Sequence, residues 1–179
     1  MQAPREGRPA PCKAPGPFPD IRCTDTRQNI RLATRMMRAY NEALCLTMTH
    51  TYQHLITEVV DKEASDLFAG LAEGDMARFR TLGQLIRALG GDPGMSLRLQ
   101  TQRVDLSEDP RSRALPALRR MLKQDLRDVA EGITELESLA AAADGWVADT
   151  LRLLIREMQL QYEALERLLR RVWDGCGGK

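Results

Sequence analysis

Four long stretches of the chain repeat apolar residues at steps of three and four, the spacing that places side chains on one face of an α-helix. They predict helices over residues of about 26–60, 61–89, 115–142 and 146–173. The apolar positions of the first helix are Ile30, Ala33, Met37, Leu44, Met48, Leu55 and Val59. Those of the fourth helix are Val147, Leu151, Leu154, Met158, Leu165, Leu168 and Val172. No alternating pattern of useful length occurs anywhere in the sequence. The chain is therefore expected to be all-α.

Helix caps, glycines and prolines between these stretches predict how the helices connect. Thr24 or Asp25 can cap the first helix and Asp61 or Ser65 the second, while the segment 90–93, "GGDP", stops the second helix. Residues 91–114 show no sustained periodicity, which is long for a connection inside a compact domain. Two short-loop hairpins joined by one long crossover predict a four-helix bundle of the single-crossover kind.

The two ends of the chain differ from this bundle. Residues 1–24 hold six of the nine prolines and are expected to form a flexible arm, followed by the bundle over 25–173 and a loose tail over 174–179. Four cysteines, Cys12, Cys23, Cys45 and Cys176, show no metal-ligand spacing and are expected to stay as thiols.

Charge and hydropathy exclude several classes of function. Twenty-six basic and 25 acidic residues give a net charge of +1, which provides no attraction for nucleic acid or an anionic membrane. No signal peptide and no apolar run of about 18 residues appear, so the expected location is the cytoplasm.

Polar residues inside the apolar stripes are the candidates for chemistry. Asp75 lies between Ala72 and Phe79 on the second helix, with Arg78 one turn later. The stripe Leu153, Glu157, Leu160 and Ala164 repeats the pattern on the fourth helix, Asp125 leans inward from the third, and His50 and His54 share a face of the first. A single such carboxylate often reaches water from the edge of a face. Where it is buried, it needs a metal ion or a basic side chain as its partner.

Several segments resemble the ferritin-like superfamily, in the branch of the rubrerythrins and the spore-coat manganese-catalase-like proteins. Residues 70–93, "GLAEGDMARFRTLGQLIRALGGDP", resemble its second helix, which carries a Glu-x-x-His pair before "LGGDP". Residues 153–169, "LLIREMQLQYEALERLL", resemble its fourth helix. "YQHL" (52–55) and "PFPDIR" (17–22) resemble the end of its first helix and its leader. The similarity extends from about residue 17 to residue 173.

The resemblance implies a di-iron or di-manganese site with six ligands, of which this chain keeps two. The family's Glu-x-x-His pairs fall on Asp75 with Arg78 and on Glu157 with Leu160, and its single glutamates fall on Ala43, next to Glu42, and on Val129. We therefore expect Asp75, Arg78 and Glu157 to form an internal ion cluster in place of the metals, because a guanidinium can donate to two carboxylates. The other interpretation is that Arg78 reaches solvent.

Two functions follow from this comparison. A ferritin-like structural or interaction module without catalysis and without a cofactor is one, acting as a homodimer or with an unidentified protein partner. The alternative is a non-standard metal protein in iron, manganese or peroxide handling, with His50, His54, Asp75, Asp125 and Glu157 as possible ligands. His50 and Asp125 are expected to form a buried hydrogen-bonded pair, because both lie towards the same end of the bundle.

Overall fold

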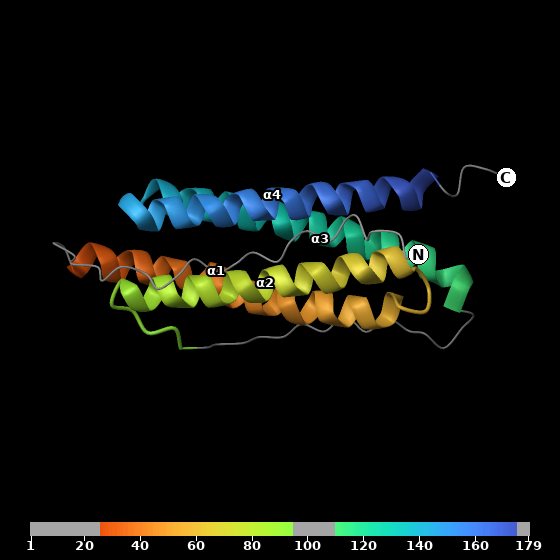
Figure 1. The fold of residues 1–179 in the computed structure, drawn as a ribbon, viewed down its shortest axis with the longest axis horizontal. Helices are drawn as coiled ribbons and strands as arrows, with labels where there is room; N and C mark the ends of the chain where they lie inside the picture. Colours follow the sequence, from red (N-terminus) through yellow and green to blue (C-terminus); the bar gives the residue numbers. More distant parts are fainter. Residues whose placement is uncertain (1–25, 95–109, 175–179) are drawn as a thin grey trace, which may run out of the picture.

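A computed structural model describes residues 26–94 and 110–174, and these residues form four α-helices without a strand. The helices are α1 (Thr26–Thr57), α2 (Lys62–Ala88), α3 (Pro110–Ala141) and α4 (Gly145–Asp174) (Figure 1). The all-α prediction is confirmed, and the predicted boundaries hold to within a few residues. The largest difference is the start of α3, because the helix continues through Pro116 instead of beginning beside it. Residues 1–24 and 175–179 of the predicted arm and tail lie outside the described residues.

The helices pair as two antiparallel hairpins, α1 with α2 and α3 with α4, which lie against each other along their length (Figure 1). Across the interface between the hairpins, α1 packs on α3 and α2 packs on α4. The end of α2 and the start of α3 lie at opposite ends of the bundle, so α2 and α3 run parallel (Figure 1). The molecule is therefore a four-helix bundle with a single crossover.

The termini of α2 follow their local sequence. Asp61 caps its first turn, since its side chain accepts a hydrogen bond of 3.0 Å from the backbone N–H of Ala64. At the other end the N–H of Gly90 donates to Arg87 O and that of Gly91 to Ile86 O, which is a Schellman motif. Gly90 has a φ of 81°, a conformation that strains any residue with a Cβ atom. The predicted stop at "GGDP" is confirmed.

Two faces of α1 are apolar, and the predicted positions mix the two. The core face contains Leu32, Ala33, Met36, Ala39, Tyr40, Ala43 and Leu46, all of which are buried. Four of the predicted positions, Ile30, Met48, Leu55 and Val59, are exposed instead. Periodicity finds an apolar line on a helix but cannot tell which of two lines faces the neighbouring helices.

The predicted inward stripe of α4 is also wrong. Leu153 and Leu160 are exposed and Glu157 is half-buried. The core face of α4 lies one position round the helix and carries the seven apolar positions predicted for this helix, which are confirmed: Val147, Leu151, Leu154, Met158, Leu165, Leu168 and Val172. None of the four helices in the described residues combines the length and the apolar character of a membrane-spanning helix.

Candidate functional site

Asp75 lies at the centre of the bundle and binds a different partner with each carboxylate oxygen. Oδ2 is 2.6 Å from Nδ1 of His50 on α1, and Oδ1 is 2.8 Å from Nη2 of Arg78 on α2. The second contact is an ion pair without hydrogen-bond alignment. All three side chains are buried. The spacing of three places Arg78 one turn after Asp75 on the same face of α2, so the pair forms within the helix.

His50 is completely buried and has a carboxylate on each side of its ring. Nδ1 contacts Asp75, while Nε2 faces Oδ1 of Asp125 on α3 at 3.9 Å and has no hydrogen-bond partner. Burial alone lowers the pKa of His50, but the hydrogen bond to Asp75 and the charges of both carboxylates outweigh it and raise that pKa above its usual value. The charged imidazolium is therefore favoured between the two acids.

Asp125 obtains its hydrogen bonds from Gln53 on α1. The amide Nε2 of Gln53 donates to both carboxylate oxygens of Asp125, at 2.9 and 3.1 Å. Burial raises the pKa of Asp125 to about 6, although the charge of His50 and the bond from Gln53 act in the opposite direction. The predicted proximity of His50 and Asp125 is confirmed, but the predicted hydrogen bond between them is wrong, because each makes its hydrogen bond to another residue.

Arg78 also contacts α4, but its partner there is Gln161 and not the predicted Glu157. Its Nη1 donates to Oε1 of Gln161 at 3.4 Å, whereas no hydrogen bond or ion pair joins Arg78 to Glu157 among the described side chains. Glu157 lies one turn before Gln161 on the edge of α4, where burial raises its pKa. Gly74 makes this approach possible, since a Cβ there would lie 2.5 Å from Nε2 of Gln161.

We define the ion network as His50, Gln53, Asp75, Arg78 and Asp125, which join α1, α2 and α3. The pair Asp75 and Arg78 was predicted, whereas Glu157 lies outside the network. Gln53 and Gln161 were missed, and the only available signal was that Gln53 follows His50 by three residues on one helix face.

His54 lies apart from this network. Its Nδ1 is 2.8 Å from Oγ of Ser65 and 3.0 Å from the Ser65 carbonyl oxygen, so its ring binds the start of α2. In the described part of the chain no group of three or more His, Cys, Asp or Glu residues is placed to hold a metal ion.

The other positions that resemble metal-ligand positions carry apolar side chains. Ala43 and Val129 are buried, and Leu160 is exposed. A cavity of about 10 Å³ lies beside Arg78 and is lined by Ala39, Glu42, Leu46, Gly132, Leu136 and Met158. This volume holds about one water molecule at most.

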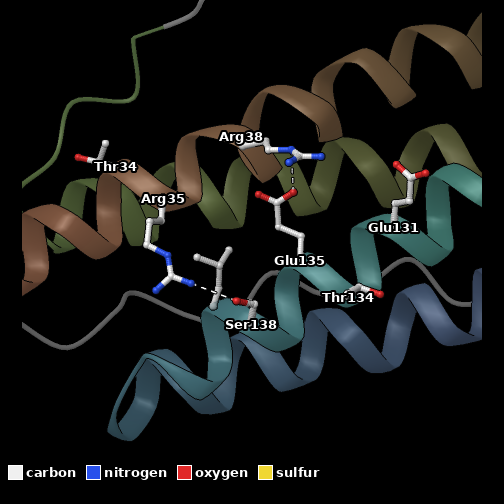
Figure 2. A pocket seen from close by; sticks show the side chains of 8 residues that line it. Thr34, Arg35, Arg38, Glu131, Thr134, Glu135 and Ser138 are labelled. Carbon is white, nitrogen blue, oxygen red and sulfur yellow. Dashed lines mark hydrogen bonds and ion pairs between the residues drawn. The ribbon is translucent and has the colours of Figure 1, made fainter.

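A much larger groove of about 640 Å³ opens on the surface between α1 and α3 (Figure 2). Arg38 reaches across it to Glu135 at 3.1 Å, and Arg35 donates to Oγ of Ser138 at 3.1 Å (Figure 2). Its basic groups are therefore already partnered across the groove. No member of the ion network lines it.

No protein-family model, no curated protein and no solved structure matches the chain.

Proposed function

We propose that the chain is a ferritin-like bundle in which the ion network replaces the dimetal centre, and that it acts as a structural or interaction module without catalysis. The observation that carries this proposal is the buried guanidinium of Arg78, which lies 2.8 Å from Asp75 at the position of a metal-binding histidine in the resemblance. The parallel course of α2 and α3 and the "LGGDP" end of α2 support the assignment to this fold.

A fixed positive charge at this point opposes the binding of metal cations. The charge of Arg78 repels a divalent ion at Asp75 and already occupies one of its oxygens. Ala43 and Val129 offer no donor atom, and the adjacent cavity of about 10 Å³ is too small for two metal ions and their ligands. Redox or peroxide chemistry at a dimetal centre therefore lacks both its ligands and its space here.

One observation favours the alternative of a single metal ion. The unpartnered Nε2 of His50 points towards Asp125, while Nδ1 is held by Asp75. A histidine that binds a metal commonly has its other ring nitrogen held by a carboxylate in this way. One iron or manganese ion between His50 and Asp125 would give a site separate from Arg78.

Elemental analysis of protein purified without an affinity tag separates these functions. We expect a colourless protein with far less than one iron or manganese per chain, because Arg78 occupies the site. One ion per chain that is lost in both His50→Gln and Asp125→Asn would instead favour the alternative. Two ions per chain together with ferroxidase or peroxidase turnover would exclude the proposed function.

A matched pair of variants tests the role of Arg78 directly. Arg78→His recreates an Asp-x-x-His pair with Asp75 and should gain weak binding of one divalent ion, measured by calorimetric titration with Mn²⁺ or Co²⁺. Arg78→Leu removes the same charge without adding a ligand and should not gain binding. Equal behaviour of the two variants would show that position 78 is not at a former metal site.

A further inference from the structure

An exposed apolar patch lies on the outer face of α1 and the turn after it. Met48, Tyr52 and Leu55 recur at steps of four and three, so they form one line along the helix, and Val59 follows in the turn after Thr57. Their exposed fractions are 45%, 40%, 60% and 87%. We call these four residues the α1 patch. Scattered exposed apolar residues need no explanation, but a continuous line of them does.

The α1 part of the patch lies in a stretch of about four helical turns without Lys, Arg, Asp or Glu. This stretch is residues 43–57, and the exposed Glu58, next to Val59, is the first charged residue after it. The first half of α1 instead carries Arg27, Arg31, Arg35 and Arg38. The exposed leucines of α4 differ in this respect, because Leu153 and Leu160 are separated by Arg156 and Glu157. The exposed apolar residues of α1 thus lie in a stretch without charged residues, whereas those of α4 have charged residues between them.

We propose that the α1 patch packs against the α1 patch of a second copy of this chain, with the two helices antiparallel about a twofold axis. A twofold interface brings one surface against itself, so a charged patch would repel its own copy. The stretch 43–57, which holds Met48, Tyr52 and Leu55, meets that condition. Antiparallel packing also points the two arginine-rich halves of α1 away from each other, whereas parallel packing would place them side by side.

The distribution of the patch sets the register of the pair. The contact between exposed side chains is greatest when the axis passes between Tyr52 and Leu55, so that Met48 meets Val59 of the partner and Tyr52 meets its Leu55. Tyr52 then lies within a few ångströms of its own counterpart along the axis. Ile30, on the same face of α1, lies about 70 Å from its counterpart, at 1.5 Å of rise per residue.

This inference rests on the proposed role as an interaction module, and the first test is the mass in solution. The full chain should show about twice its 20.1 kDa by light scattering or sedimentation, with dissociation in the micromolar range because one helix face is a small interface. Leu55→Glu should weaken the dimer at least tenfold, since the change places two carboxylates in the apolar contact. Leu153→Glu is the matched control, with a 55% exposed leucine on α4, and should leave the dimer intact.

Cross-linking tests the orientation. In a chain whose four native cysteines are replaced by serine, Tyr52→Cys should form a cross-linked dimer on mild oxidation. Ile30→Cys, with a similar exposed fraction of 45%, should not. Cross-linking of both variants would show parallel packing, and cross-linking of neither would show a different interface.

Other outcomes overturn the inference. A monomer at about 100 µM, where even a micromolar complex is populated, would contradict it. If Leu55→Glu then also lowered the melting midpoint of that monomer, the patch would be covered by the chain itself. A dimer lost in Leu153→Glu but kept in Leu55→Glu would place the interface on α4. Metal content is measured separately, so a metal-loaded dimer would contradict the proposed function without contradicting this interface.

Discussion

A substitution of Arg78 removes one member of the buried ion pair with Asp75 and leaves the other member in place. Arg78 is 5% exposed and its partner Asp75 is completely buried. His50 binds the other oxygen of Asp75, so removal of Arg78 leaves that carboxylate with one cationic neighbour instead of two. The third member of the buried cluster is thus His50 and not Glu157.

Arg78→Leu should lower the free energy of unfolding by about 3 kcal/mol at neutral pH, because the buried carboxylate of Asp75 loses one of its two cationic neighbours. Denaturant unfolding at neutral pH measures the change. Arg80→Leu, an exposed arginine on the same helix, is the control and should change stability by about 0.5 kcal/mol or less. Equal effects of the two variants would show that Arg78 is not a buried partner of Asp75.

The removal of Arg78 should also affect His50. The positive charge of Arg78 acts to lower the pKa of His50, so Arg78→Leu should raise that pKa further, which NMR titration of the imidazole can measure. A fall in the pKa of His50 would contradict the contact geometry.

Sequence reasoning predicts the site in part because some contacts are local and others are not. Asp75 and Arg78 are three residues apart on one helix, so their pairing follows from helix geometry. The choice between Asp75 and Asp125 as the partner of His50 depends on how three helices pack. Gln53 and Gln161 leave no mark in the sequence, since a neutral amide fits both a helix surface and a buried hydrogen bond.

At the scale of the helices, the local rules and the packing contribute different information. Caps and glycine stops placed the ends of α2 correctly, because those signals act within a few residues. The buried face of α1 could not be chosen from periodicity, since Met36 and Tyr40 form one apolar line and Met48 and Leu55 form another. A helix with two apolar lines needs its neighbours to decide between them. The second line is where the proposed dimer contact lies.

A Gly→Ala substitution should change the free energy of unfolding in opposite directions at Gly70, inside α2, and at Gly90, just after it. Gly90→Ala should lower the free energy of unfolding by about 1 kcal/mol, because alanine is strained at a φ of 81°. Gly70→Ala should raise it by about 0.5–1 kcal/mol, since a Cβ at this helical position meets nothing within 4 Å. Thermal or denaturant unfolding of the two variants measures both changes. A stabilising Gly90→Ala would contradict the Schellman motif at the end of α2.

On the scale of the whole molecule, polar contacts connect the two hairpins at separate levels. Gln53 binds Asp125 between α1 and α3, and Arg78 binds Gln161 between α2 and α4. Arg171 of α4 pairs with Asp61, the cap of α2, at 2.6 Å. The first two of these contacts belong to or adjoin the ion network. Titration of the network should therefore be visible in the stability of the complete bundle.

The stability of the bundle should fall as pH rises from about 4 to beyond 7. Burial raises the pKa of Asp125 to about 6 and also raises the pKa values of Glu42 and Glu157, while the pKa of His50 is raised by its acidic neighbours. A raised pKa means that the folded state holds its proton more tightly than the unfolded state does. Each of these groups therefore stabilises the fold at low pH and loses that contribution as pH passes through its folded pKa.

Asp125 loses its contribution between about 4 and 6, and His50 loses its own above about 6.5. For Asp125 the loss is of the order of 3 kcal/mol, at about 1.4 kcal/mol per pKa unit. Melting midpoints should accordingly fall between pH 5 and pH 8, and Asp125→Asn should flatten the curve below pH 6. Asp149→Asn, at an exposed carboxylate of α4, is the matched control and should keep the parent's curve, because its side chain is 72% exposed to water in the folded chain. Melting midpoints that rise through this range in the parent would contradict this prediction. They would show that Asp125 is ionised inside the bundle at little cost in stability, and that burial beside His50 and Gln53 does not raise its pKa.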